Sequence, residues 1–152
     1  MDGILIRKAE REDASSIIRF QKMMALETEG LELDPAELEK GVTKVFGNTA
    51  LGFYHIAESR GTIIACHLVT YEWSDWRNKF VYWVQSVYVE KEYREKGVFK
   101  RMYEKLKHMA AADPDVGGIR LYVVRENLVA QKVYEKLGMD GDHYRMFEWM
   151  KE

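Results

Sequence analysis

Residues 93–106 read YREKGVFKRMYEKL, and an apolar helical pattern starts directly after the glycine in this stretch. Val98, Met102 and Leu106 recur at the spacing of one helical face, which predicts a helix that begins at Gly97. Helices usually begin on Ser, Thr, Asp or Asn, because these side chains accept hydrogen bonds from the N–H groups of the first turn. Glycine offers no such acceptor. An anion from outside the chain is therefore a candidate partner for these N–H groups.

The charges around this turn also favour an anion. Basic side chains outnumber acidic ones between residues 91 and 101, where Lys91, Arg94, Lys96, Lys100 and Arg101 stand against Glu92 and Glu95. A strand, a glycine turn and a helix N-terminus together present backbone N–H groups and the positive end of the helix dipole, an arrangement that holds phosphate in many proteins. The alternative is an ordinary strand–turn–helix connection with a solvated basic face.

The composition is that of a globular protein without a highly charged partner. The chain has 152 residues, of which 47% are hydrophobic, and its net charge is −2. This length predicts a single domain over residues 1–152 with a full core. The near-neutral charge gives no reason to expect nucleic acid or a membrane surface as a partner, whereas a local basic turn can still bind a small anion.

Cysteine usage and apolar runs indicate the compartment. The only cysteine, Cys66, lies in the apolar run IIACHLV, so we expect a buried, inert thiol and no internal disulfide. No stretch approaches the ~20 apolar residues of a membrane span, and the first apolar segment is too short for a signal peptide. We therefore expect a cytoplasmic protein. The four histidines show no metal-ligand spacing, so no metal site is expected.

Hydrophobic periodicity and turn residues predict an α/β fold with a mixed sheet, in the order β-α-α-β-β-β-α-β-α-β. Asp13 opens the first helix, Pro35 is the first residue of the second, and residues 59–61 form a hairpin turn. The strands over residues 80–89 and 118–124 are joined by a helix, which makes them parallel. The expected strands are residues 4–7, GFYHIAE from residue 52, TIIACHLVTYEW from residue 62, residues 80–89, residues 118–124 and HYRMFEWMK from residue 143.

The second half of the chain resembles the GNAT family of N-acetyltransferases in the order and spacing of its motifs. The acetyl-CoA motif of that family reads Arg or Gln, two residues, Gly, one residue, then Gly or Ala, and Arg94 and Gly97 match it. A later element reads Asn, two residues, Ala, three residues, Tyr, three residues, Gly. All four of its positions are matched, by Asn127, Ala130, Tyr134 and Gly138. The expected order of strands and helices also matches that family over essentially the whole chain.

The resemblance implies an acetyl-CoA-dependent N-acetyltransferase in which the strands over residues 80–89 and 118–124 splay apart. The pantetheine arm then lies in the gap and bonds to the backbone of Val87 and Val89, because separated strands leave N–H and C=O groups that need partners. The turn that follows holds the diphosphate. The implied cofactor-binding residues are Val87, Tyr88, Val89, Arg94, Glu95, Lys96, Gly97, Val98, Phe99, Lys100, Asn127, Ala130 and Tyr134.

One position departs from the family pattern. Phe99 stands where the family has Gly or Ala, a position kept small so that the helix comes close to the pyrophosphate. Either the ring of Phe99 points into the core and the backbone still reaches the phosphates, or the cofactor lies differently. We favour the first alternative, because Phe99 and Tyr103 continue the apolar side of the helix.

Acetyl transfer from a thioester to an amine needs a neutral amine, a donor for the developing oxyanion and a proton for the departing thiolate. A backbone N–H near Val87 can stabilise the oxyanion. In the family, the tyrosine that matches Tyr134 protonates the thiolate, and a phenol with a reference pKa of ~10 can do so. The alternative for Tyr134 is a core aromatic with a satisfied hydroxyl. Asn127 can cap its helix as well as contact the cofactor.

The general base is left open by the sequence. Polyamine acetyltransferases of the same family carry carboxylates in the middle of the fourth strand, and the matching positions here are Gln85 and Ser86. This departure argues against a polyamine acceptor of that branch. The remaining candidates are Glu29, His67, Glu72 and a chain of water molecules, although His67 lies in an apolar strand and Glu72 near a hairpin.

Two features are candidates for the acceptor site. The loop ETEGLELD, residues 27–34, is acidic, and three aromatic residues precede the long strand. Acidic and aromatic side chains together suit a cationic amine, whereas a solvated loop and cross-strand stacking are the alternative. The candidate acceptor-binding residues are Glu29, Tyr71, Trp73, Trp76 and Gln85.

These observations predict transfer of an acetyl group from acetyl-CoA to a primary amine of a small molecule or a peptide by direct attack. A non-catalytic CoA-binding regulatory module is the alternative, because of Phe99 and the absent strand carboxylates. An unrelated nucleotide-binding α/β domain would rest on the phosphate turn alone. A homodimer is common in the family that the chain resembles, and we include it among the expectations.

Overall fold

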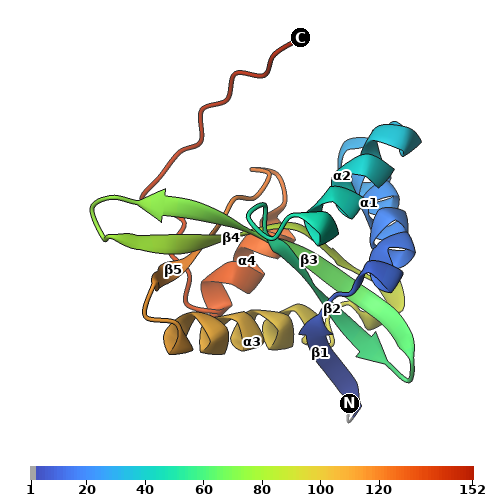
Figure 1. Ribbon diagram of the computed structural model, residues 1–152, viewed down its shortest axis with the longest axis horizontal. Helices are drawn as coiled ribbons and strands as arrows, with labels where there is room; N and C mark the ends of the chain where they lie inside the picture. The colour runs from blue at the N-terminus through green and yellow to red at the C-terminus, as the bar shows by residue number, and fades with distance from the viewer. Residues whose placement is uncertain (1–2) are drawn as a thin grey trace. The chain divides into compact units, whose positions relative to one another are not determined.

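Figure 1 shows the computed structural model, which describes residues 3–152. The contacts divide the chain into two compact units, Met1–Arg120 and Leu121–Glu152, so the single domain expected from the length stays a prediction. The elements are β1 (Ile4–Lys8), η1 (Arg11–Asp13), α1 (Ala14–Glu29), α2 (Pro35–Gly47), β2 (Phe53–Ser59), β3 (Thr62–Ser74), β4 (Lys79–Val89), η2 (Lys91–Tyr93), α3 (Val98–Ala112), β5 (Val116–Leu121) and α4 (Leu128–Lys136).

The strands form one sheet in the order β1-β2-β3-β4-β5. β1 pairs with β2, β2 with β3 and β3 with β4, each time antiparallel, and Ile56 of β2 stands opposite Cys66 of β3. β5 follows β4 through α3, the kind of crossover that joins parallel strands. The two strands start side by side, since the N–H of Phe80 donates to the carbonyl of Asp115 at 2.8 Å. The predicted α/β fold with a mixed sheet is confirmed.

Helices cover both faces of this sheet (Figure 1). On one face, α1 and α2 share an apolar cluster with Cys66 and Tyr88, and the ring of Phe20 stacks on Tyr88 at 5.0 Å between centroids. On the other face, Met102 of α3 packs against Ala65 in a second cluster. Each large apolar side chain buried in this way stabilises the fold by about 1.5–3 kcal/mol. We call these two sides the α1 face and the α3 face.

The helices begin at the residues that the sequence predicts. Pro35 is the first residue of α2, and the side chain of Asp34 accepts a hydrogen bond from the N–H of Glu37 at 2.8 Å. α1 ends at Gly30, whose φ of 63° is a conformation that glycine adopts without strain. α3 begins directly after Gly97, which has a φ of 73°, and no side chain caps it.

The predicted bounds of the fifth strand are wrong. β5 spans Val116–Leu121, whereas the expected segment is 118–124. The strand therefore starts two residues earlier than expected and also ends three residues earlier than expected. The sequence predicts a later start because DPDVGG, residues 113–118, contains the Pro and Gly that mark the end of the preceding helix. Here Gly117 and Gly118 are part of β5, and a Cβ built on Gly117 would lie 3.3 Å from the Cβ of Lys79, so the position favours a residue without a side chain.

The predicted closing strand over residues 143–151 does not form. This segment contains neither strand nor helix, and Phe147 and Trp149 are 90% and 86% exposed. The alternation of its side chains is real, but a strand also needs the N–H and C=O groups of a neighbouring strand. The observed order of the described elements therefore ends with α4.

Candidate active site

The turn before α3 has the geometry of an anion site. Glu95 and Gly97 both have a positive φ, of 60° and 73°. The N–H of Arg101 makes a hydrogen bond of 3.1 Å to the carbonyl of Gly97, so the N–H groups of residues 98–100 precede the regular bonding of the helix. A Cβ built on Gly97 would meet no atom within 4 Å. Open space, N–H groups and the positive end of the helix dipole therefore coincide here.

Arg94 connects this turn to the rest of the first unit. Its guanidinium donates to Glu27 at 2.7 Å and to the carbonyl of Val89 at 2.8 Å, and Lys91 lies 3.5 Å from the same carboxylate. Burial raises the pKa of Glu27, but the hydrogen bonds and charges of Arg94 and Lys91 together lower it by a larger amount. The net shift of the pKa is therefore downward. Because Arg94 is engaged in this way, we expect the phosphate contacts to come chiefly from the backbone N–H groups.

The remaining predicted cofactor residues of the turn differ in exposure. Glu95, Lys96 and Lys100 are exposed, whereas Val98 is 2% exposed and belongs to the core under α3. The ammonium group of Lys96 lies 5.5 Å from the centroid of the Tyr93 ring. The turn therefore combines an apolar anchor with cations at its surface.

A bulge interrupts β4 at the position where the resemblance places the thioester. Ser86 and Val87 of β4 together stand opposite the single residue His67 of β3. Ser86 has a φ of 55°, and its carbonyl lies 3.5 Å from the amide nitrogen of Gln21 on α1. A bulge bends its strand and disrupts the ladder locally. The backbone of Val87 is therefore displaced from the regular pairing of β3 with β4.

β5 runs beside only part of β4. The two strands start together, and β5 ends after six residues, whereas β4 has eleven. At ~3.3 Å per residue, six residues reach roughly as far as Ser86. The backbone of Val87–Val89 thus lies beyond the end of β5. An extended ligand such as pantetheine can pair with a strand in this position.

A row of polar side chains follows β4 on the α1 face. Gln85 donates to the hydroxyl of Thr70 at 2.8 Å, and the indole N–H of Trp83 donates to Glu72 at 2.8 Å. Glu72 also forms an ion pair with Arg120 of β5. The side chains of Glu72 and Arg120 are 36% and 29% exposed, so solutes can reach this pair.

The second unit carries the later motif on α4. The side chain of Asn127 caps the helix, because it accepts a hydrogen bond from the N–H of Ala130 at 3.1 Å. Tyr134 follows Ala130 by one helical turn, so both lie on the same side of α4. Burial raises the pKa of the Tyr134 phenol. Gly138 ends the segment with a φ of 82°. The four matched residues therefore belong to one capped helix and its C-terminal end.

The sequence profile of the Acetyltransferase (GNAT) family matches residues 16–139. The chain belongs to this family. It is 26% identical to thialysine N-epsilon-acetyltransferase of Bos taurus, over 91% of this chain and 85% of that protein. This GNAT protein is therefore an acetyl-CoA-dependent N-acetyltransferase, as its motifs predict.

Solved structures share the fold of this GNAT acetyltransferase. A possible acetyltransferase from Clostridium difficile is 41% identical, with a TM-score of 0.91 and coverage of 99% of both chains. A predicted acetyltransferase from Clostridium acetobutylicum, solved with acetyl-CoA, is 24% identical and has a TM-score of 0.75 over 95% of this chain and 96% of that one. The chain thus shares its fold with a protein whose crystal structure contains acetyl-CoA.

Phe99, the departure from the GNAT motif, packs toward the sheet. Its ring lies edge-on to His67 at 6.5 Å between centroids and stacks with Tyr103 at 6.4 Å. The large side chain is therefore directed to the α3 face of the sheet. This orientation agrees with the first of the two alternatives, while the position of the cofactor stays a prediction.

Two histidines form a buried pair beneath α3. Nε2 of His67 lies 3.2 Å from Nδ1 of His55, and the residues are 0% and 1% exposed. Burial lowers the pKa of His67 to about 3 and that of His55 to about 4. A group with so low a pKa cannot draw a proton from an amine at neutral pH. The structure therefore argues against His67 as the general base.

The two carboxylate candidates for the base have different surroundings. Glu72 accepts a hydrogen bond from Trp83 on one carboxylate oxygen and from Arg120 on the other. Glu29 is the exposed last residue of α1. Glu29, Glu72 and a chain of water molecules stay the candidates for the general base.

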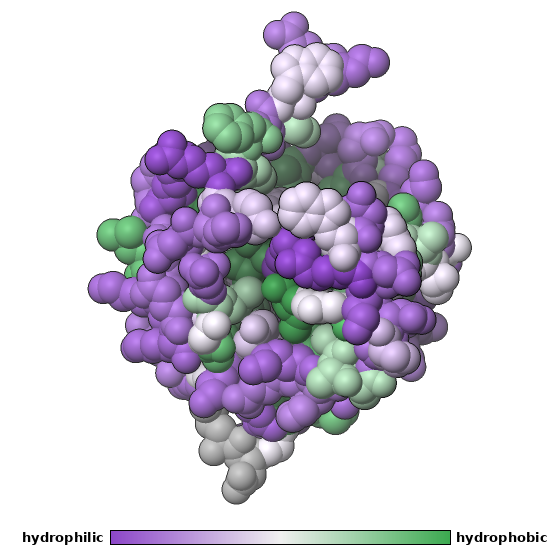
Figure 2. Space-filling model, turned by 90° about the vertical axis from the view of Figure 1, so that its left-hand side faces the viewer, coloured by the Kyte–Doolittle hydropathy of each residue, from purple (hydrophilic) through white to green (hydrophobic). Residues whose placement is uncertain are grey.

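The aromatic residues predicted to bind the acceptor lie on the α3 face. Tyr71 and Trp73 both contact Phe80, at 6.0 and 5.0 Å between centroids, and Trp76 is 91% exposed in the hairpin turn. Gln85 lies on the opposite α1 face. Figure 2 views the protein from the side where the β3–β4 hairpin ends in Figure 1, and hydrophilic residues cover most of that side. The structure thus does not bring the aromatic residues and Gln85 together.

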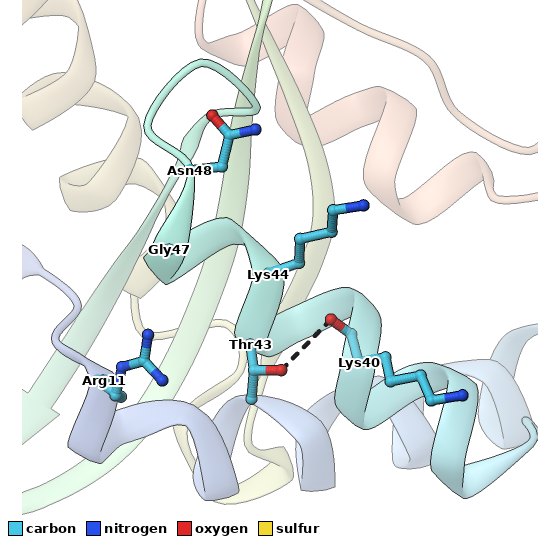
Figure 3. A pocket seen from close by; sticks show the side chains of 6 residues that line it. All are labelled: Arg11, Lys40, Thr43, Lys44, Gly47 and Asn48. Atoms are coloured by element: carbon cyan, nitrogen blue, oxygen red, sulfur yellow. Dashed lines mark hydrogen bonds between the residues drawn. The ribbon is translucent and has the colours of Figure 1, made fainter.

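A separate basic pocket of about 490 Å³ lies beside the C-terminal part of α2. Figure 3 shows Arg11 on one side of it and two lysines of α2 on the other, with the hydroxyl of Thr43 bonded to the carbonyl of Lys40 at 3.3 Å. Cations near a helix C-terminus complement the negative end of its dipole. None of the predicted site residues lines this pocket. Its lining residues are Arg11, Lys40, Thr43, Lys44, Gly47 and Asn48.

Among residues 3–152, no group of three or more His, Cys, Asp or Glu side chains is arranged to hold a metal ion. In the same range, no helix has the length and apolar character needed to cross a membrane.

Proposed function

We propose that acetyl-CoA binds with its diphosphate at the first turn of α3 and its pantetheine arm along Val87–Val89. The start of α3 carries this proposal, because Gly97 is left-handed, has open space in front of it and leaves the helix without a capping side chain. Free N–H groups at a helix N-terminus bind phosphate. The strand residues beyond the end of β5 offer main-chain groups to the amides of pantetheine.

In this proposal the acceptor amine attacks the thioester carbon directly. The carbonyl oxygen becomes an oxyanion, which the backbone N–H of Val87 stabilises. The carbon–sulfur bond then breaks, and the CoA thiolate takes the phenolic proton of Tyr134, which solvent later restores. The nitrogen releases its proton to water, so that an amide and free CoA result. The raised pKa of Tyr134 keeps its phenol protonated at neutral pH.

The acceptor that fits best is the primary amine of a small molecule or of an exposed peptide. A curated relative acts, by its name, on the ε-nitrogen of thialysine. Gln85 and Ser86 replace the strand carboxylates of the polyamine branch, which argues against a polyamine. A cytoplasmic location and a homodimer complete the proposal. Cys66 is buried with a free thiol, which fits a reducing compartment.

Thiol release tests this function directly. Purified protein is mixed with acetyl-CoA and a panel of amines, and free CoA is measured with a thiol reagent. We expect release above the hydrolytic background with at least one class of primary amine. Tight binding of acetyl-CoA without release across the panel would instead favour the non-catalytic CoA-binding module, for which the departure at Phe99 is the supporting observation.

Gly97→Ala tests the diphosphate site. A Cβ at this left-handed position destabilises the fold by about 1 kcal/mol and projects into the space assigned to the diphosphate. We expect the affinity for acetyl-CoA to fall about tenfold or more, measured by calorimetry, which corresponds to ~1.4 kcal/mol.

Gly61→Ala is the matched control, because Gly61 lies in the β2–β3 turn with a φ of 79° and also has open space around it. It should show the same loss of stability with unchanged affinity for acetyl-CoA. Equal affinities in the two variants would remove Gly97 from the cofactor site.

A further inference from the structure

The ion pair between Glu72 and Arg120 connects two strands that are not neighbours. Glu72 belongs to β3 and Arg120 to β5, so the pair passes over β4 at Val81, which stands opposite Glu72 and is 3% exposed. Both charged side chains lie on the α1 face, in the same row as Gln85. The indole of Trp83 fixes the carboxylate from the side by a hydrogen bond of 2.8 Å.

This pair presents one positive and one negative charge to solvent at adjacent positions. Ion pairs that water can reach contribute at most ~1 kcal/mol, because water screens them, so a solute can open this partly exposed pair at small cost. An α-amino acid offers both counter-charges on one carbon: its carboxylate suits the fork of a guanidinium, and its ammonium suits a carboxylate. A monoamine or a simple diamine satisfies at most one of the two groups.

The distance from this ion pair to the bulge in β4 determines how long the acceptor must be between its charged head group and its reacting amine. The carboxylate of Glu72 lies beside Val81 and Trp83, and the bulge begins at Ser86, so the two levels are roughly 10–13 Å apart along β4. A head group that makes a hydrogen bond of ~2.9 Å and an amine that stands ~3.3 Å from the thioester carbon leave about 4–7 Å between them. A zigzag chain of roughly three to five bonds of ~1.5 Å spans that gap, and the five bonds from the Cα to the Nζ of lysine lie within this range.

We propose that Arg120 and Glu72 form a subsite for an amino acid, in which Arg120 binds the α-carboxylate and Glu72 binds the α-ammonium group. The side-chain amine of this amino acid is the group that is acetylated. The inference rests on the proposed function, because it takes the thioester to lie at the bulge. The acceptor class is thus a free amino acid with a terminal amine on a chain of about lysine length. Gln85 lies between head group and bulge, beside the chain.

The acceptor panel tests this proposal on the unmodified protein. It contains L-lysine, 1,5-diaminopentane without the carboxylate, 6-aminohexanoate without the α-ammonium, n-pentylamine without either, and 2,3-diaminopropionate with a shorter chain. We expect kcat/KM for lysine to exceed that for each single-charge analogue by about tenfold, the usual effect of one charge-assisted hydrogen bond. The short diamino acid should be a poor acceptor, because its head group cannot reach the pair.

Two variants assign each charge to its side chain. Arg120→Gln should bring the ratio of kcat/KM for lysine over 1,5-diaminopentane close to one while the ratio over 6-aminohexanoate persists. Glu72→Gln should do the opposite. Lys40→Gln is the control, because Lys40 forms an exposed ion pair with Glu37 at 2.9 Å on α2, and both ratios should survive. Affinity for acetyl-CoA, measured on each variant, shows that it is folded.

The possible results distinguish failure of the amino-acid subsite from failure of the proposed acetyltransferase function. Equal kcat/KM for lysine and n-pentylamine would overturn the amino-acid subsite and leave the acetyltransfer standing, and this result needs no variant. Ratios that change together in Arg120→Gln and Glu72→Gln, or change in Lys40→Gln, would also overturn it. Absence of transfer to every amine would overturn the subsite together with the proposed function.

Discussion

Replacement of Tyr134 by Phe is expected to lower kcat by about 10²–10⁴-fold, the range for loss of a positioned general acid. The phenol carries the proton that the departing CoA thiolate needs, and burial holds that proton in place by raising the pKa of Tyr134. Phe keeps the ring, so the packing of α4 and the binding of acetyl-CoA should persist. Steady-state thiol release gives kcat, and calorimetry gives the affinity for acetyl-CoA.

The matched control is Tyr144→Phe, because Tyr144 is 69% exposed and belongs to the segment after α4. This variant should keep the kcat of the unmodified protein. The pH dependence adds a second test, since a protonated phenol is required: on the alkaline side, activity of the unmodified protein should fall only above the ordinary tyrosine pKa of ~10. The fall on the acid side reflects protonation of the acceptor amine, which must be neutral to attack. A kcat for Tyr134→Phe within threefold of normal would show that the thiolate obtains its proton elsewhere.

Local chemistry made the helix starts and the phosphate turn predictable. Pro35 and Asp34 mark the start of α2 by their own backbone and capping preferences, and the structure shows both in those roles. Gly97 marks the start of α3 because the helical pattern begins beside a residue that cannot cap it. These features depend on neighbours in the chain, so the sequence contains them.

Features that depend on long-range pairing were not predictable in the same way. The bulge at Ser86 places a positive φ on a residue that is not glycine, so the residue type at this position does not predict the bulge. The alternation of β3 puts Tyr71 and Trp73 on one face and Glu72 on the other, and this could have been found by counting from Cys66. The ion pair of Glu72 with Arg120 required knowledge of the strand order.

The stability of the protein is expected to fall steeply between pH 6.5 and pH 4 because of the buried histidine pair. Burial lowers the pKa of His67 to about 3, and burial together with the charges of Lys105 and Lys8 lowers that of His55 to about 4. Unfolded histidine has a pKa near 6.5. As the pH falls below that value the unfolded chain binds protons first, so stability present above pH 6.5 is lost toward pH 4. Each histidine contributes a slope of at most ~1.4 kcal/mol per pH unit.

Urea unfolding at pH 7, 6 and 5 measures this slope. Two histidines acting together would cost about 3–4 kcal/mol between pH 7 and pH 5, a large share of the 5–15 kcal/mol typical of a domain. The double variant His55→Leu/His67→Leu should have a much flatter profile, whatever its stability at pH 7. His108 and His143 are exposed, so His108→Gln/His143→Gln should keep the original slope.

The buried histidine pair, and not the ion-paired carboxylates, determines how stability changes between pH 6.5 and pH 4. Burial raises the pKa of Asp13, but the hydrogen bonds from Arg7 and from the N–H of Glu10, together with the charge of Arg7, lower it by more. The stability that Asp13 contributes is therefore lost only below the ordinary Asp range near pH 4. The same sign holds for Glu27, whose pKa Arg94 lowers. A decline that begins near pH 6.5 must therefore come from groups that are neutral when folded and charged when unfolded. If the double variant retained the full decline, the histidines would not be those groups.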